Sequence, residues 1–294
     1  MVSGRKLHLQ APAKINLYLK VLGRRHDGYH ELSTWMQKLK LADEITLSSV
    51  STGIKLHCPG TDLAADESNL AHKAAVLFLQ KTGLKTGVEI KLVKNIPIAA
   101  GLGGGSSDAA AVLTGLNKLF SAGVSDKELM EFGLSLGADV PFFVSGCSAA
   151  IATGIGEKLQ GKDSLKECWF VLVNPDFPVS TKWVFENFDR AQPVNFALTS
   201  GDNPYILGRE INGSMPEMFL NDLESVTTAR YPEVSKLKKK LTDLGASGAL
   251  MSGSGPTVFG IFMDFGLATQ CAINLQHVYP GRVFLTEPLS SSFK

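Results

Sequence analysis

Apolar and polar positions alternate along residues 7–21 of the chain. A period of two is typical of a β-strand with one face toward a core and the other toward water. The expected core face carries Ile15, Leu17, Leu19 and Val21. The expected water-facing side carries Lys14, Asn16, Tyr18 and Lys20, after a kink at Ala11-Pro12-Ala13. Lys14 and Asn16 therefore project side by side, either as plain solvent-facing residues or toward a site.

Similar patterns predict the other elements of the N-terminal half. Short strand-like runs at 32–39, 44–49 and 54–57 predict an N-terminal antiparallel sheet. The alternating run 88–94 predicts a further strand that leads into a glycine-rich loop. An amphipathic helix is expected from the segment Glu67-Ser68-Asn69-Leu70 to about Thr82, with Gly83 as its stop. The run Ser125-Asp126-Lys127-Glu128 forms a capping box at the start of another helix, which Gly137 ends.

The segment after Gly137 is expected to leave the helix. Pro141 disfavours the α conformation at Val140, which predicts that Asp139 lies at a helix-to-extended junction bordered by aromatic rings. A carboxylate in such a setting is either capped by backbone donors or kept for chemistry.

The pattern of the C-terminal half predicts alternating strands and helices. A buried strand is expected at 169–173, a short helix at 180–188, an amphipathic helix at 232–244, a glycine-rich turn and strand at 248–259, a helix near 267–278 and a strand near 283–286. The segment 192–215 is polar and irregular, which predicts a variable loop. The whole pattern favours an α+β fold.

The stretch from Pro97 to Ala110 combines a glycine cluster with the start of a helix. Four glycines within five positions precede Ser106, Ser107 and Asp108, and an alanine-rich run follows. A glycine-lined turn that leads into a helix start suits an anion, because the first N–H groups of a helix lack partners. The stretch has no Walker lysine, and Ser106 stands where a dinucleotide motif needs its last glycine. The alternative interpretation is a flexible turn before a core helix.

Composition narrows the class of protein. The chain has 294 residues, 44% hydrophobic content and a net charge of +1, which predicts an ordinary soluble protein of two lobes. The lysines at 236–240 are expected to form a solvated helix face, so no nucleic acid partner is predicted. The N-terminus lacks the apolar region of a signal peptide, and no membrane span is predicted. The four cysteines show neither zinc nor disulfide spacing, which favours a cytoplasmic location.

Three blocks together resemble the motifs of the superfamily of galactokinase, homoserine kinase, mevalonate kinase and phosphomevalonate kinase, the GHMP kinases. The blocks are Pro12-Ala13-Lys14-Ile15-Asn16-Leu17, the glycine block that ends at Asp108, and Ser252-Gly253-Ser254-Gly255-Pro256-Thr257. Three further segments resemble the branch that acts on 4-diphosphocytidyl-2-C-methyl-D-erythritol in non-mevalonate isoprenoid synthesis. These are Gly28-Tyr29-His30, Gly137-Ala138-Asp139-Val140-Pro141 and Asn221-Asp222-Leu223-Glu224.

The resemblance implies a two-lobed fold and phosphoryl transfer from ATP, with Mg²⁺, to the 2-hydroxyl of this substrate. An ATP-binding lobe over 1–160 resembles domain 2 of ribosomal protein S5, and a ferredoxin-like α/β sandwich over 161–294 lies on the substrate side. The implied catalytic residues are Lys14 and Asp139. The implied ATP-binding residues are Asn69, Lys94, Pro97, Gly101, Leu102, Gly103, Gly104, Gly105, Ser106 and Ser107. The implied substrate-binding residues are Asn16, Tyr29, His30, Asp139, Thr181 and Phe185.

In the implied arrangement, Tyr29 and Phe185 stack on the cytosine, while His30 hydrogen-bonds its edge. No carboxylate pair marks a metal site, so only Ser106 or Ser107 is a candidate for contact with Mg²⁺. Asp108 is expected to stabilise the start of its helix.

Two other functions stay open. One is a different small-molecule kinase of the superfamily, of the homoserine or mevalonate type. The other is a nucleotide-binding sensor that has lost catalysis, which the presence of both Lys14 and Asp139 disfavours. A monomer or a weak homodimer is expected.

Overall fold

The larger of two β-sheets is built on a long N-terminal hairpin. The computed structural model describes residues 4–175, 177–191, 219–280 and 282–290, so the predicted loop at 192–215 lies outside the described residues. Seven strands form this sheet, in the order β3-β4-β2-β1-β8, with β5 on β2 and β6 on β5. They are β1 (Lys6–Arg24), β2 (His30–Val50), β3 (Ile54–His57), β4 (Gly87–Val93), β5 (Ala149–Gly154), β6 (Lys158–Lys162) and β8 (Leu220–Asn221).

Strand β2 replaces the two separate strands expected at 32–39 and 44–49. Ala42 and Asp43, which lie between the two expected strands, stay in register with Pro12 and Ala11 of β1. The buried Asp43 carboxylate accepts hydrogen bonds from the backbone N–H groups of Asn95 and Ile96. These bonds replace the hydrogen bonds to water that the carboxylate loses on burial. Pairing with β1 therefore joins the two expected strands into one continuous strand.

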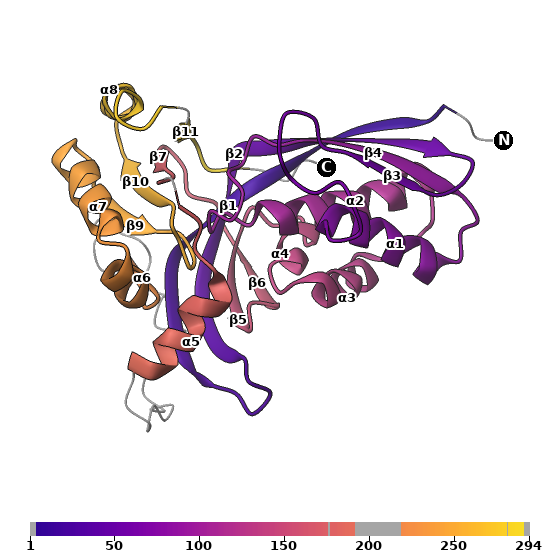
Figure 1. Ribbon diagram of the computed structural model, residues 1–294, viewed down its shortest axis with the longest axis horizontal. Coiled ribbons are helices and arrows are strands. Elements are labelled where there is room, and N and C mark those ends of the chain that lie inside the picture. Colours follow the sequence, from indigo (N-terminus) through magenta and orange to yellow (C-terminus); the bar gives the residue numbers. More distant parts are fainter. Residues whose placement is uncertain (1–3, 176, 192–218, 281, 291–294) are drawn as a thin grey trace.

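Helices cover one face of this sheet. They are α1 (Leu70–Thr82), α2 (Gly104–Phe120), α3 (Asp126–Leu136) and the short α4 (Val140–Val144) (Figure 1). Small residues of α2 allow a close approach to the sheet, since a Cβ on Gly115 would overlap the side chains of Leu9 and Leu47. The core between these layers joins alanines of α1 and α2 to Ile45, Leu47 and Ile90 of the strands.

The predicted helix ends are confirmed where the signal is local. Asn69 caps α1 by accepting from the N–H of Ala71, and Gly83 ends it with a left-handed φ of 68°. Ser125 and Glu128 form the reciprocal capping box of α3, and Gly137 follows its last turn.

The expectation for Val140 is wrong. Val140 is the first residue of α4, and Asp139, at its N-cap, has helical dihedrals of −80° and −17°. Pro141 fits in this first turn because an N–H at that position needs no intrahelical acceptor.

The second sheet has four antiparallel strands in the order β11-β7-β10-β9. They are β7 (Trp169–Val173), β9 (Gly248–Met251), β10 (Val258–Phe262) and β11 (Val283–Thr286), and the helices around them are α5 (Thr181–Ala191), α6 (Glu224–Arg230), α7 (Glu233–Asp243) and α8 (Phe265–Gln276). A β-α-β-β-α-β order with the last strand beside the first is ferredoxin-like, as predicted. Figure 1 shows α6, α7 and α8 gathered around this sheet at one end of the molecule.

The two sheets meet along the N-terminal hairpin. The short strand β8 pairs in parallel with Tyr18 and Leu19 of β1, and Leu39 of β2 forms a bridge with Pro288. The side-chain amide of Asn221, in β8, donates to the carbonyls of Met251 and Gly253, which ties the turn after β9 to the larger sheet. The domain boundary predicted at 160/161 falls within β6, and the division into two lobes stays a prediction.

None of the helices in the part of the chain that the structure describes is long and apolar enough to cross a membrane.

Candidate active site

A cavity of about 1220 Å³ lies where the helical layer of the larger sheet, the N-terminal hairpin and the second sheet come together. Every site residue predicted from the sequence lines it, with the exception of Ser107. The lining predicted residues are Lys14, Asn16, Tyr29, His30, Asn69, Lys94, Pro97, Gly101, Leu102, Gly103, Gly104, Gly105, Ser106, Asp139, Thr181 and Phe185. Ser107 is buried in α2, and its hydroxyl has no hydrogen-bond partner among the described residues.

The glycine loop before α2 is held from two sides. On one side, the backbone N–H of Lys14 donates to the carbonyl of Leu102 at 2.9 Å. On the other, the Ser252 hydroxyl donates to the carbonyl of Gly101 at 2.9 Å. The first sequence block, which contains Lys14, and the third, which contains Ser252, therefore both hydrogen-bond to the glycine loop of the second block.

Gly103 must be a glycine for two reasons. Its φ of +70° lies in the left-handed region, and a Cβ there would stand 2.9 Å from the Phe143 ring and 3.0 Å from Lys14 Cγ. As the N-cap of α2 it offers no side-chain hydrogen bond, so the first N–H groups of the helix stay available to an anionic ligand.

Two residues on the polar side of β1 are buried, contrary to the prediction of a wet face. Lys14 is 5% exposed and Asn16 is 2% exposed. Lys14 Nζ donates to Asn16 Oδ1 at 2.7 Å, and Asn16 Nδ2 donates to Thr34 Oγ1 at 2.8 Å. The Thr34 hydroxyl in turn donates to the carbonyl of Tyr18 at 2.6 Å. This directional chain fixes the Asn16 amide so that its oxygen faces the ammonium of Lys14.

Asp139 lies beside Lys14 at the start of α4. The distance from Lys14 Nζ to Asp139 Oδ2 is 3.4 Å, and the Asp139 side chain is 35% exposed toward the cavity. At the other end of α4, the buried Lys38 of β2 donates to the carbonyl of Phe143 at 3.2 Å. Burial lowers the pKa of Lys38 to about 8. The carboxylate of Asp139 is thus held on a short helix that is anchored at both ends.

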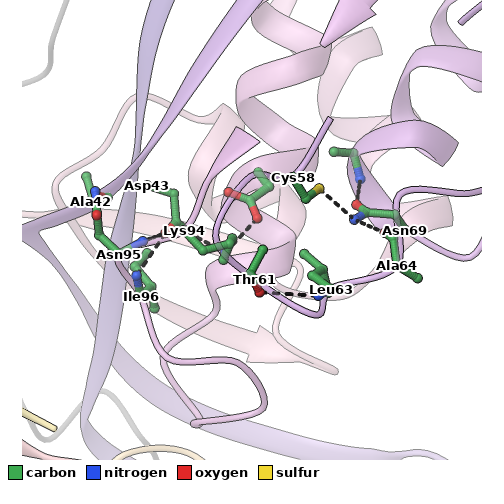
Figure 2. Close-up of polar contacts among 12 residues, drawn as sticks. Ala42, Asp43, Cys58, Thr61, Leu63, Ala64, Asn69, Lys94, Asn95 and Ile96 are labelled. Atoms are coloured by element: carbon green, nitrogen blue, oxygen red, sulfur yellow. Dashed lines mark hydrogen bonds and ion pairs between the residues drawn. The ribbon is translucent and has the colours of Figure 1, made fainter. Parts of the chain in front are cut away.

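Lys94 is enclosed by two buried carboxylates (Figure 2). Its ammonium contacts Asp43 and lies 2.8 Å from Asp108 Oδ2. Asp108 was expected to stabilise the helix start, but its described partner is Lys94, which replaces that interpretation. Burial raises the pKa of the Asp108 carboxyl to about 7, against the effect of the nearby Lys94. Lys94 therefore joins β4, β2 and α2 beneath the glycine loop instead of standing as an unpaired cation.

Asn69 lies at the far end of the cavity, on the side away from the hairpin loop. Its oxygen accepts from Ala71 and its nitrogen donates to the carbonyl of Ala64 at 2.8 Å, near Cys58 (Figure 2). Both polar atoms of this side chain are thus occupied in shaping the helix start and the loop before it.

The opposite end of the cavity carries aromatic rings. Tyr29, in the hairpin loop, is 61% exposed. His30 is buried and stacks on Phe185 of α5, with a centroid distance of 4.8 Å and an interplanar angle of 23°. Both rings line the cavity, so a flat ligand there meets His30 and Phe185 together. Thr181, at the start of α5, shares a 2.8 Å hydrogen bond with the Ser254 hydroxyl.

Several polar residues of the site were not predicted. Asp43, Thr34 and Asp189 each contact a predicted residue, at separations along the chain of 51, 18 and 159 positions respectively. Their neighbours in sequence carry no motif. Only the alternation of β2 could have placed Thr34 beside Asn16, on the same sheet face.

Mg²⁺ prefers oxygen ligands and keeps several waters or phosphate oxygens. The described residues contain no group of three or more His, Cys, Asp or Glu side chains that could hold a metal ion. Ser106 lines the cavity and supplies a hard oxygen atom. This residue fits an ion that is bound largely by a phosphorylated ligand.

The chain matches known proteins over both halves. Residues 69–147 match the GHMP kinases N terminal domain, and residues 204–280 match the GHMP kinases C terminal region. A 4-diphosphocytidyl-2-C-methyl-D-erythritol kinase of Syntrophotalea carbinolica is 47% identical over 95% of this chain and 98% of that protein. A protein of the same name from Geobacter metallireducens is 48% identical over 88% of this chain and 90% of its own length.

Solved structures agree with the sequence matches. A crystal structure of 4-(cytidine 5'-diphospho)-2C-methyl-D-erythritol kinase superposes with a TM-score of 0.76 at 36% identity, covering 95% of this chain and 98% of that one. A homoserine kinase from Cytophaga hutchinsonii superposes with a TM-score of 0.73 at 18% identity, covering 99% and 97%. At that identity the second likeness concerns the fold alone.

Proposed function

The chain belongs to the GHMP kinase family, and from that premise we propose that it transfers the γ-phosphoryl group of ATP to the 2-hydroxyl of 4-diphosphocytidyl-2-C-methyl-D-erythritol. The observation that carries this proposal is the near-complete match to relatives that bear this substrate in their names. The cavity supports it, because the Lys14–Asp139 pair stands between the glycine loop and an aromatic end suited to a flat base.

ATP binds with its phosphates against the glycine loop. Unpaired N–H groups at the start of α2 and the close approach at Gly101 and Gly103 allow backbone donors to surround the phosphate oxygens. Asn69 and Lys94 lie toward the nucleoside end. Lys94 acts there by holding the loop in shape, because its charge is already matched by Asp43 and Asp108.

Asp139 takes the proton of the substrate hydroxyl as its oxygen attacks the γ-phosphorus. The new oxygen–phosphorus bond forms while the bond from the γ-phosphorus to the bridging oxygen breaks, which releases ADP. Lys14 lowers the pKa of the attacking hydroxyl and stabilises the charge that develops on the transferred group. The buried chain from Lys14 through Asn16 to Thr34 keeps the ammonium in place, so that little reorganisation is needed during the reaction.

The substrate is held at the aromatic end. Tyr29 and Phe185 stack on the cytosine, and His30 binds its edge. Thr181 lies near the diphosphate and Asn16 near the methylerythritol. Mg²⁺, when bound with ATP, neutralises phosphate charge; Ser106, which lines the cavity, is the serine we propose to contact it in preference to Ser107.

Acceptor specificity tests this function. ADP release is measured with the purified chain, ATP and Mg²⁺, and with the cytidine diphosphate substrate, homoserine or mevalonate as the acceptor. We expect release with the first acceptor alone. Release only with homoserine or mevalonate would assign another kinase of the family, and ATP binding without acceptor-dependent release would assign the sensor.

A further inference from the structure

His30 is held in a fixed orientation between two residues of α5. Its ring stacks on Phe185, and its Nε2 atom lies 2.6 Å from Asp189 Oδ1. The His30 side chain is 7% exposed and that of Asp189 is 27% exposed, so the bond is largely shielded from water. Both residues line the cavity.

The carboxylate of Asp189 determines which ring nitrogen carries the proton. An ionised carboxylate only accepts hydrogen bonds, so Nε2 of His30 must carry a hydrogen to form the observed contact. In the neutral ring, Nδ1 is then an acceptor. Among the described residues, none forms a hydrogen bond with Nδ1 of His30. The lone pair of Nδ1 is therefore left for a ligand in the cavity.

Arg24 of the hairpin forms an ion pair with the same carboxylate. Its Nε atom lies 3.6 Å from Asp189 Oδ2, the carboxylate oxygen that does not contact His30, and the Arg24 side chain is 63% exposed. A cation on that side favours an oxygen atom over an amide nitrogen, because the hydrogens of an amide nitrogen carry partial positive charge.

We propose that Asp189 is a positioning residue that makes the enzyme select cytosine over uracil, by holding His30 with its proton on Nε2 and its acceptor on Nδ1. This inference rests on the proposed function, because it takes the base of the substrate to lie against His30.

The chemistry of the two bases supports the assignment. Cytosine carries an exocyclic amino group at C4, which donates a hydrogen bond to an acceptor such as Nδ1. Uracil carries a carbonyl oxygen at the same position, so two lone pairs would face each other and a buried acceptor would be left unpaired. Sites built to hydrogen-bond one group discriminate strongly against an analogue that lacks it.

The protonation state can be measured without any substrate. Long-range ¹H–¹⁵N spectra of the free protein report which nitrogen of each histidine ring is protonated, and a His30→Gln variant identifies the His30 signals. We expect a protonated Nε2 and an unprotonated Nδ1. A His30 ring protonated on Nδ1 in the wild-type protein would overturn the inference, and it would leave the proposed function standing.

The Asp189→Asn substitution is the sharpest test. Arg24 favours the amide oxygen on its own side, so the amide nitrogen faces His30 and donates to Nε2, which moves the ring proton to Nδ1. We expect the ¹⁵N pattern of His30 to reverse. The ratio of kcat/KM for the cytidine substrate to that for its uridine counterpart should fall at least roughly tenfold.

Two controls separate this effect from a general weakening. Asp189→Ala removes the partner and should give a smaller loss of selectivity, with a ring of mixed tautomers. Asp243→Asn makes the same change in charge on the exposed helix α7 and should leave both the ratio and the spectrum unchanged. An unchanged base preference in Asp189→Asn, with a reversed ring, would overturn the role in selectivity.

If neither the cytidine nor the uridine substrate is phosphorylated by the wild-type chain, the proposed function fails instead.

Discussion

The ammonium of Lys14 stands 3.4 Å from the carboxylate of Asp139, although the two residues come from opposite ends of the N-terminal half of the chain. Lys14 is buried on β1 and bonded to Asn16, whereas Asp139 begins the short helix α4 and faces the cavity. A rigid cation beside a more accessible carboxylate suits phosphoryl transfer to a hydroxyl group. The Asp139 carboxylate can accept the hydroxyl proton, while the Lys14 ammonium stabilises the negative charge that develops.

Replacement of Tyr29 by alanine should affect the acceptor and not the donor. The exposed ring offers stacking area to the base, so we expect KM for the cytidine substrate to rise roughly 2- to 10-fold and KM for ATP to stay nearly constant. His26→Ala, an exposed ring in the same loop, is the matched control. Equal changes in both KM values would contradict the stacking role.

Gly103→Ala tests the close packing of the glycine loop, and Gly123→Ala separates packing from backbone strain. The two glycines have φ values of +70° and +72°, but a Cβ meets the Phe143 ring and Lys14 only at Gly103. Each substitution should cost about 1–2 kcal/mol in the free energy of unfolding. Only Gly103→Ala should also weaken ATP binding, as measured by titration. Normal ATP affinity in that variant would refute the proposed fit of the loop.

Lys94→Met should destabilise the fold strongly. The change leaves Asp43 and Asp108 buried without their cation, which typically costs about 3–5 kcal/mol in the free energy of unfolding. Urea denaturation measures the loss. Lys239→Met, which removes the cation of an exposed pair, should show little change. Equal stability of the two variants would argue against a structural role for the cluster.

The buried Asp108 should give stability a specific dependence on pH. Its pKa is raised to about 7 in the folded protein, well above 3.8, so the folded state holds more protons than the unfolded state between these values. The contribution to stability is therefore complete below about pH 4 and is lost as the pH rises through 7.

Urea titrations from pH 5 to pH 8 test this dependence. They should show a steeper fall in the free energy of unfolding for the wild-type protein than for Asp108→Asn, whose amide does not titrate. Parallel curves would contradict the raised pKa.

Features encoded by neighbouring residues were predicted well. The caps at Asn69, Gly83 and Ser125 depend on side chains within a turn or two of the helix, so the sequence pattern contains the whole interaction. The three motif blocks also indicated the cavity, because backbone geometry and small side chains determine the glycine loop.

Features that depend on distant partners were not predictable. Alternation alone left Lys14 and Asn16 either solvent-facing or directed toward a site, because it reports the polarity of a strand face and not what covers that face. The role of Asp43 depends on the backbone donors of Asn95 and Ile96, which lie 52 and 53 positions later in the chain. The contact between His30 and Asp189 likewise joins a hairpin to a helix of the other half of the chain.

Val140 shows the limit of a local rule. The residue before a proline avoids the α region on average, but the first turn of a helix tolerates Pro141, and the bond from the Val140 N–H to the carbonyl of Gly137, at 3.1 Å, favours the turn. The error concerned only the backbone conformation at Asp139 and Val140. The prediction of Asp139 as a site residue did not depend on it.

Acceptor-dependent ADP release by Asp139→Asn tests the central claim most directly. The amide keeps the shape of the side chain and cannot accept the hydroxyl proton as a base. We expect ATP to bind with unchanged affinity, while the rate of transfer to the cytidine diphosphate substrate falls by about 10²- to 10⁴-fold. A rate equal to that of the wild-type protein would show that the catalytic carboxylate lies elsewhere and would contradict the account.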